Sequence, residues 1–165
     1  RGKEANAIRR AHHDYIRLFD SWSTHNYNIM PQPFLDWGLN REGVEYIPFW
    51  RNPYITCEDP DVLISCWRLP DRLLMEVFNH DKAETKDVVL AVDLEALGLQ
   101  PKRPWQDFLR LTALDHDMQT KGVFSRGMPD EEEWRQSPKL DYDQGQVTVP
   151  NIIPRRARFL NLQRY

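Results

Sequence analysis

Three short segments combine histidine with carboxylate side chains, the residue types that carry out acid–base catalysis and bind metal ions. They are residues 12–14 (HHD), 80–81 (HD) and 115–117 (DHD). Adjacent histidines on a helix point about 100° apart, whereas helical zinc sites use histidines four residues apart, so the first segment favours a solvated or partly packed pair. The second fits a turn, where aspartate is favoured. The third lacks the glycine and final glutamate of a calcium loop. We therefore expect no metal ion and no other cofactor.

Signatures of a nucleophile or of a catalytic acid pair are missing from the sequence. It contains no G-x-S-x-G elbow, no P-loop and no G-x-G-x-x-G motif, and Cys57 has no recognisable histidine partner. Glu76 is the one acid expected inside an apolar strand, but a glycosidase needs two carboxyl groups across a cleft. The acidic run at 129–134 (PDEEEW) fits a solvated face or the start of a short helix. An enzyme in its own right is therefore a weaker hypothesis.

The six tryptophans are a better lead to function. Exposed aromatic rings bind the apolar faces of sugar rings, and small-molecule sites are rich in aromatic side chains. Our candidate carbohydrate-binding residues are Trp37, Trp50 and Trp134. Trp37 and Trp134 lie in irregular or polar segments, where a core position is least expected. The alternative is that most of the tryptophans fill the core and the junction between helix and sheet, which is the usual place for large aromatic residues.

The bulk properties are those of one ordinary globular domain. The chain has 165 residues, a net charge of −3 and a pI of about 6.0, which argues against a nucleic-acid partner. No apolar run approaches the ~20 residues that span a bilayer, so we expect no membrane partner. Two cysteines do not make a disulfide scaffold, and Cys66 is expected to pack as a small hydrophobic residue. The first residue is Arg1 rather than Met, so we expect a segment of a longer protein.

The N-terminal part is predicted to be a helix followed by an irregular connector. Over residues 3–22, apolar residues recur every three or four positions and form one stripe, with charged residues on the outer face. The stripe contains Ile8, Ala11, Tyr15, Leu18, Phe19 and Trp22, and the outer face Arg9, Arg10, Asp14 and Arg17. Residues 27–43 carry two prolines and two glycines, so we expect a connector without regular structure, packed by Phe34, Leu35 and Trp37.

From residue 44 the pattern changes to short strands with turn signals between them. Residues 44–50 are expected as an edge strand or an irregular strand because of Pro48. Residues 62–67 and 72–79 should form a hairpin through the Pro-Asp turn at 70–71. Further strands are expected at 86–93, in a hairpin over 139–150 around Gln144-Gly145, and at 156–165. Residues 105–114 fit a strand or a short helix, and Thr112 and the β-rich neighbourhood favour the strand. A helical turn is expected at 94–99 and an exposed loop at 116–139. This spacing is typical of an antiparallel sandwich.

Side-chain alternation predicts the faces of two of these strands. Leu73, Met75 and Val77 should share one face, with Leu74, Glu76 and Phe78 on the other. Val88, Leu90 and Val92 should likewise point one way. The predicted fold class is mainly β, an antiparallel β-sandwich over 44–165, preceded by an N-terminal helix and connector over 1–43.

The order of these elements resembles the C-terminal β-sandwich that follows the catalytic barrel in many glycoside hydrolases and glycosidase-like proteins. The resemblance rests on the strand "VLISCWR", on a second strand ending in asparagine ("LLMEVFN"), and on a third that alternates valine and leucine. It includes a D-x-x-x-L-G-L turn, made by Asp93, Leu97, Gly98 and Leu99, and a final V-x-V-P element, made by Val147, Val149 and Pro150. It covers roughly residues 44–165, and residues 1–43 would be the end of the barrel or its linker.

The resemblance implies a non-catalytic domain whose partner is the upstream catalytic domain of the same chain. The family's catalytic carboxylates lie in the barrel, so none is carried over to this sequence. If the parent protein degrades polysaccharides, a secreted or periplasmic location is implied. The alternatives are a carbohydrate-binding module that uses exposed aromatic residues, an enzyme in its own right, and a protein-interaction domain that binds through residues 116–139.

Overall fold

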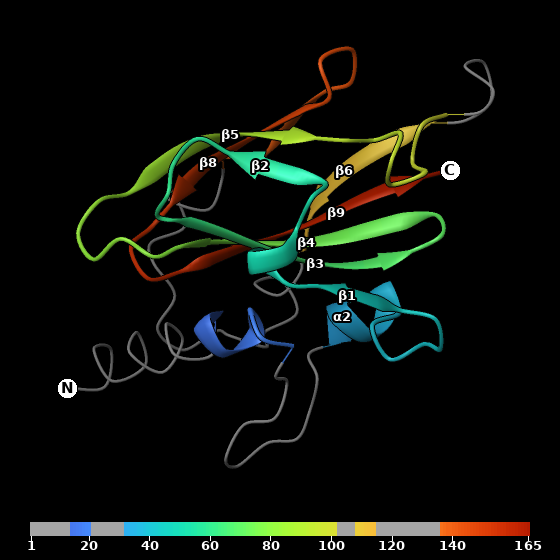
Figure 1. Ribbon diagram of the computed structural model, residues 1–165, viewed down its shortest axis with the longest axis horizontal. Helices are drawn as coiled ribbons and strands as arrows, with labels where there is room; N and C mark the ends of the chain where they lie inside the picture. The colour runs from blue at the N-terminus through green and yellow to red at the C-terminus, as the bar shows by residue number, and fades with distance from the viewer. Residues whose placement is uncertain (1–13, 21–31, 102–107, 115–135) are drawn as a thin grey trace.

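The protein is a two-sheet antiparallel β-sandwich with helical segments on one outer face (Figure 1). The structure is a computed structural model and describes residues 14–20, 32–101, 108–114 and 136–165. Its elements are α2 (Gln32–Trp37), β1 (Glu45–Ile47), a 3-10 helix (Phe49–Arg51), β2 (Ile55–Cys57), β3 (Val62–Leu69), β4 (Arg72–Asn79), β5 (Lys86–Val92), β6 (Leu109–Ala113), β7 (Lys139–Asp141), β8 (Gln146–Ile152) and β9 (Ala157–Arg164). The predicted fold class is confirmed.

One sheet has five strands in the order β1-β3-β4-β9-β6, and the other has four in the order β2-β5-β8-β7. Every pairing within the two sheets is antiparallel. β3 and β4 form the expected hairpin, with Leu69 opposite Arg72 across the turn. β9, the last strand, lies between β4 and β6 and so places the C-terminal segment inside the larger sheet.

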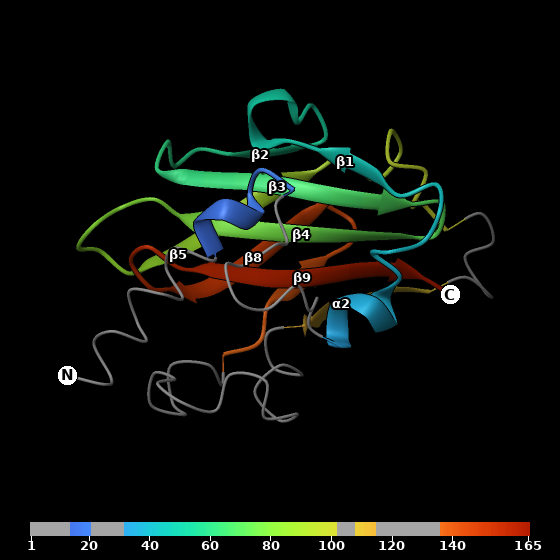
Figure 2. The ribbon, with the colours of Figure 1, turned by 90° about the horizontal axis from the view of Figure 1, so that it is seen from below.

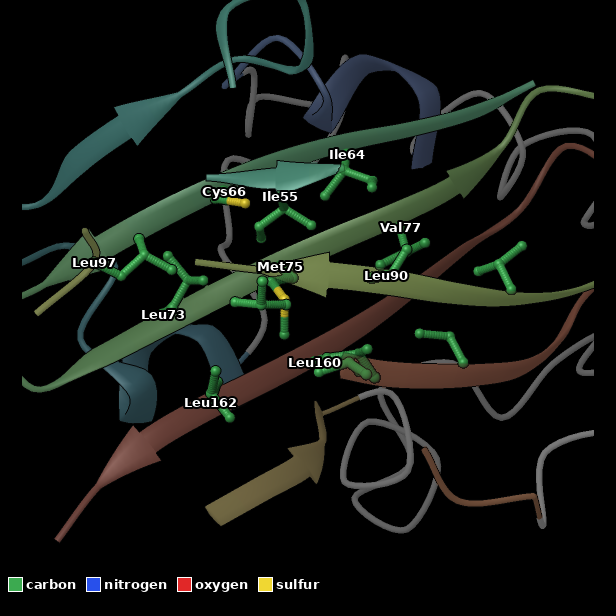
Figure 3. Packing of buried hydrophobic residues seen from close by; sticks show 14 of the residues in the cluster. Ile55, Ile64, Cys66, Leu73, Met75, Val77, Leu90, Leu97, Leu160 and Leu162 are labelled. Carbon is green, nitrogen blue, oxygen red and sulfur yellow. The ribbon is translucent and has the colours of Figure 1, made fainter. Parts of the chain in front are cut away.

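The core lies between the two sheets and confirms the predicted faces. Figure 3 shows Leu73, Met75 and Val77 of β4 among the buried residues between the layers. Leu90 of β5 enters the same cluster from the opposite sheet, together with Val88 and Val92. Inward alternation at a period of two therefore places these residues as the sequence predicts.

The five-stranded sheet is buried on its outer face as well. Residues 14–20 and α2 lie on this face, as the view from below shows (Figure 2). A second buried cluster joins Leu18 and Phe34 from these helical segments to Leu74 and Phe78 of β4. Because both of its faces are covered, β4 is a nearly continuous run of buried residues. The molecule thus has three layers: a four-stranded sheet, a five-stranded sheet and a helical cover.

The expectation of an irregular connector over 27–43 is wrong for residues 32–37, which form α2. Pro33 is the second residue of this helix, where the missing N–H has no intrahelical partner to lose. Gly38 follows the helix with φ +102, and its N–H bonds the carbonyl oxygen of Phe34 at 3.1 Å. The pattern of proline at the start and glycine just after the end therefore indicates a short helix.

Several strand boundaries also differ from the prediction. β1 is shorter than the predicted strand over 44–50 but lies at the sheet edge as expected. Residues 49–51, directly after Pro48, form a 3-10 helix instead of continuing the strand. The strand β2 was missed because it has only three residues. Residues 109–113 are a strand as predicted, and the 139–150 hairpin turns through Gly145 at φ +61. The 94–99 segment is a turn in which Gly98 takes φ +69.

Some predictions concern residues outside the described ranges. Of the expected helix over 3–22, the structure describes 14–20, where residues 14–17 are helical. Most of the expected loop at 116–139 lies outside, as does Trp134. Both cysteines have free thiols, and Cys66 is buried in the core as expected. In the part of the chain that the structure describes, no helix has the length and apolarity needed to cross a membrane.

Candidate functional site

The candidate site lies where residues 14–20 meet the outer face of the five-stranded sheet, and polar contacts fix this short segment in place. Oδ2 of Asp14 accepts hydrogen bonds from Nε of Arg156 at 2.8 Å and from the backbone N–H of Ala157 at 3.3 Å. The carbonyl oxygen of Leu18 accepts a bond from Oγ of Ser65 at 2.8 Å, and a second bond from the hydroxyl of Tyr46. The segment is thereby attached to β1, β3 and the start of β9.

The orientation of this segment corrects the sequence-based assignment of its faces. Leu18 is fully buried, as expected, but Asp14 and Arg17, which were assigned to the outer face, are also buried. Tyr15 and Phe19, which were assigned to the apolar stripe, are 39% and 44% exposed. Burial of the charged pair is tolerated because Asp14 bonds Arg156 and lies 3.5 Å from Nη1 of Arg17.

The exposed rings of this segment continue onto the 3-10 helix and form what we call the aromatic ridge: Tyr15, Phe19, Phe49 and Trp50. The ring centroids of Tyr15 and Phe19 are 5.5 Å apart, and those of Phe19 and Trp50 are 5.6 Å apart. Phe49 stands edge-on to Trp50 at 5.0 Å and 90° and also contacts Phe19 at 5.8 Å. Edge-to-face contacts of this kind are favourable aromatic geometry. The ridge is therefore a connected surface rather than scattered rings.

The 3-10 helix holds its half of the ridge through bonds to β3. The N–H of Phe49 donates to Oγ of Ser65 at 3.1 Å. Asn52, directly after the helix, donates from Nδ2 to the carbonyl oxygen of Ile64 at 3.0 Å. Its Oδ1 accepts the N–H groups of Tyr54 and Ile55, both at 3.1 Å. This amide closes the turn between the 3-10 helix and β2 and orients the two rings before it.

A second unusual feature is Glu76, which lies beneath residues 14–20 in the middle of β4. Its side chain is fully buried, and neither carboxyl oxygen has a hydrogen-bond partner among the residues that the structure describes. Burial raises the pKa of Glu76 well above its ordinary value; the nearby negative charge of Asp14 raises it further and Arg17 lowers it. A carboxyl group in this environment is held as the neutral acid.

No group of three or more His, Cys, Asp or Glu side chains capable of holding a metal ion occurs among the residues described. Burial raises the pKa of the Cys57 thiol, which makes it a poorer nucleophile. The outer face of the four-stranded sheet carries a shallow hollow of about 520 Å³ lined by Thr56, Cys57, Glu58, Asp59, Asp87, Val88, Val89, Ala91 and Gln146. It brings together no constellation with a recognisable chemistry.

The three candidate carbohydrate-binding tryptophans differ in their exposure and position. Trp50 is 53% exposed and belongs to the aromatic ridge. Trp37 is only 4% exposed, and its Nε1 donates to Oδ1 of Asn161 at 2.8 Å, so its ring is a core element with no open face for a ligand. Trp134 lies outside the described residues. Tyr15 and Phe19 were missed as partners of Trp50 because their helical spacing fits a buried stripe equally well.

Asp81 takes the role that its position in a turn predicts. Its Oδ1 accepts the backbone N–H groups of Ala83 at 2.7 Å and Glu84 at 3.0 Å. These bonds lower the pKa of the Asp81 carboxyl. The adjacent His80 lies beside the ridge, with its ring 6.3 Å from that of Tyr15. The His-Asp pair at 80–81 is thus part of the turn that leads from β4 in one sheet to β5 in the other, and not of a hairpin.

Comparison of the chain with models of known protein families, with curated proteins and with solved structures finds no match.

Proposed function

We propose that this chain is a non-catalytic β-sandwich domain of a glycoside hydrolase-like protein, and that it supports an upstream catalytic barrel. The observation that carries the proposal is the buried cluster shared by the helical cover and the sheet. Leu18, Phe34 and Trp37 of the cover pack with the outer face of the five-stranded sheet. Residues 1–43 would be the end of the barrel or its linker by the resemblance described above. A shared core there would fix the orientation of the preceding domain.

The shared core makes a specific prediction for unfolding. Leu18 is fully buried, so Leu18→Ala should lower the free energy of unfolding by about 2–5 kcal/mol, as large-to-small core substitutions do. At pH 5, unfolding of the wild-type chain should be a single transition when followed both by tryptophan fluorescence and by circular dichroism. Two separate transitions, with Leu18→Ala affecting only one, would show that the N-terminal part is not integral to the sandwich, and the proposal would fail.

A second candidate function is carbohydrate binding, and the aromatic ridge favours it. The rings of Phe19 and Trp50 lie at an interplanar angle of 33°, closer to parallel than perpendicular. Both are exposed, and the ring of Phe49 stands edge-on to each of them. Exposed aromatic faces bordered by a few polar groups suit the apolar faces of sugar rings, and Arg51 is an exposed polar neighbour.

One set of measurements separates the two candidates. The wild-type chain, Trp50→Ala and Tyr142→Ala are titrated with a panel of soluble oligosaccharides and polysaccharides, with tryptophan fluorescence as the readout. Tyr142 is the matched control because it is 44% exposed and lies in the β7–β8 turn of the other sheet. Saturable binding that is lost in Trp50→Ala and kept in Tyr142→Ala supports the binding module. A cooperatively folded chain that binds no glycan supports the structural domain.

The same glycan panel tests the claim that the chain is non-catalytic. Release of reducing sugar is measured after prolonged incubation with the purified chain. We expect no release above the buffer blank. Turnover that co-purifies with the folded chain through two chromatographic steps would overturn the proposal.

A further inference from the structure

Glu76 occupies a position from which a charge would act on the helical cover. It lies in β4, with Ser65 of β3 on one side and Phe159 of β9 on the other. The two flanking strands prevent water from reaching it along the sheet, and the carboxyl is fully buried. Its two oxygens are unpartnered. A buried carboxylate without partners is strongly unfavourable, so the group stays neutral or the site must open.

The charged and titratable groups around Glu76 come from three elements. Residues 14–20 contribute Asp14 and Arg17, which act on Glu76 with opposite signs. β1 contributes Tyr46, and β3 contributes Cys66. Burial raises the pKa of both of these groups, and the proximity of Glu76 adds to this effect. Among the groups that the structure describes around Glu76, Arg17 is the one that favours its charged form.

We propose that Glu76 is a pH-sensitive latch: as the neutral acid it lets residues 14–20 lie on the sheet, and its ionisation at higher pH releases them and takes the aromatic ridge apart. When Glu76 loses its proton to solvent, the new charge requires water. Residues 14–20 can admit water at lower cost than the sheet, because displacing them breaks the contacts of Asp14, Leu18 and Asp20 but leaves the backbone pairing of β4 with β3 and β9 intact. Repulsion between the Glu76 and Asp14 carboxylates acts in the same direction, since Asp14 fastens the segment to Arg156 and Ala157.

Release of residues 14–20 would separate the aromatic ridge into two pairs of rings. Tyr15 and Phe19 would leave with the segment, whereas Phe49 and Trp50 remain on the sheet edge through the bond from Phe49 to Ser65. Ser65 would lose only its bond to the carbonyl oxygen of Leu18. The core between the two sheets contains no residue of the segment and would stay intact. Any ligand or partner that needs the whole ridge would therefore bind more weakly at alkaline pH.

The sign of the pH dependence follows from linkage. The pKa of Glu76 is higher in the folded state than its ordinary value of 4.5. Below that ordinary value Glu76 is neutral whether the segment is docked or released, so the contribution of Glu76 to docking is fully present. As the pH rises towards the higher folded-state pKa, the released state loses the proton more readily than the docked state, so docking weakens. A single group gives at most about a tenfold change in the docking equilibrium for each pH unit.

Hydrogen exchange between pH 5 and pH 9, expressed as protection factors, tests the latch without any ligand. The reporters are the amides of Phe19 and Asp20, which bond within the segment, and the indole N–H of Trp67, which bonds Oδ1 of Asp20 at 2.7 Å. The reference is the amide of Met75, inside the sheet. Glu76→Gln keeps the shape of the side chain and removes the titratable group. Glu76→Met also removes the titratable group and replaces it with an apolar side chain. Glu84→Gln is the control, because Glu84 is an exposed acid.

We expect protection of the three reporters in the wild-type chain and in Glu84→Gln to fall by up to about tenfold per pH unit while Met75 stays protected. In Glu76→Gln and Glu76→Met, reporter protection should be independent of pH. Three results would overturn the inference. They are pH-independent protection in the wild-type chain, the same pH dependence after substitution of Glu76, and simultaneous loss of protection at Met75, which would mean global unfolding. This test is independent of glycan binding, so its failure leaves the proposed function standing.

Discussion

The indole Nε1 of Trp37 donates a hydrogen bond of 2.8 Å to Oδ1 of Asn161, which links α2 to the middle of β9 across 124 residues of sequence. Both side chains are buried. Asn161 also directs its Nδ2 towards Oγ1 of Thr112 at 3.3 Å, so one amide connects α2, β9 and β6. The helical cover is thus held to the sheet by specific polar contacts as well as by apolar packing.

Removing this acceptor should destabilise the protein. Asn161→Ala leaves the Trp37 N–H buried without a partner, and we expect the free energy of unfolding to fall by about 1–3 kcal/mol. Chemical denaturation of Asn161→Ala, Trp37→Phe and the double variant forms a double-mutant cycle. A coupling energy near zero would show that the bond contributes nothing beyond packing.

Asp14 should matter more than an exposed acid. Asp14→Asn removes the charge that balances the buried Arg156, and breaking one side of a buried ion pair costs about 3–5 kcal/mol. We expect a clear fall in the urea midpoint of Asp14→Asn. Glu95→Gln, an exposed acid in the 94–98 turn, is the control and should stay within about 0.5 kcal/mol of the wild type. Equal effects of the two substitutions would contradict the assignment of Asp14 as an anchor.

The two faces of β4 should contribute alike to stability. Leu73 packs between the sheets and Leu74 packs under the helical cover, and both are fully buried. Leu73→Ala and Leu74→Ala should each lower the free energy of unfolding by about 2–5 kcal/mol in denaturant titrations. Val89→Ala, on the half-exposed outer face of β5, should cost much less. A small effect of Leu74→Ala would mean that the cover does not exclude water from this face.

Alanine substitutions at two glycines with positive φ distinguish the cost of backbone strain from the cost of a steric collision. Gly145 has φ +61, and a Cβ there would lie 2.9 Å from the carbonyl oxygen of Val92. Gly43 has φ +85, and a Cβ would meet no atom within 4 Å. Gly43→Ala should therefore cost about 1 kcal/mol from the left-handed conformation alone, and Gly145→Ala clearly more. Thermal unfolding of both variants tests whether Gly145→Ala is the more destabilising substitution. The steric collision at Gly145 predicts this difference, whereas backbone strain alone predicts similar effects at the two positions.

The strands and their inner faces were predictable because they depend on local signals. The alternation in Leu73, Met75 and Val77 indicates a strand and its buried face without knowledge of its neighbours. The Gln144-Gly145 pair likewise predicts a hairpin turn, since glycine tolerates the positive φ that the turn needs. Short elements were less visible: β2 has too few residues to show a period, and the prolines near α2 obscured a helix of only six residues.

The candidate site was predictable only in part. Trp50 could be named from its residue type, but the sequence did not distinguish it from Trp37, which is buried. The difference arises from packing: Trp37 finds the acceptor Asn161 far along the chain, whereas Trp50 follows Pro48 onto a 3-10 helix at the sheet edge. Helical spacing alone predicted that Tyr15 and Phe19 lie in the core. The spacing does not show which side of the segment faces the sheet, because charged residues such as Asp14 can also be buried when they have buried partners.

Local chemistry in the chain was therefore enough to establish an antiparallel β-sandwich, the faces of β4 and β5, and a hairpin around Gly145. The pairing of distant segments established the rest, including the place of β9 between β4 and β6 and the covering of the outer face by residues 14–20 and α2. Glu76 shows the reason most clearly. Its position in an apolar strand can be read along the chain, but its burial without a partner depends on β3, β9 and the cover meeting around it in space.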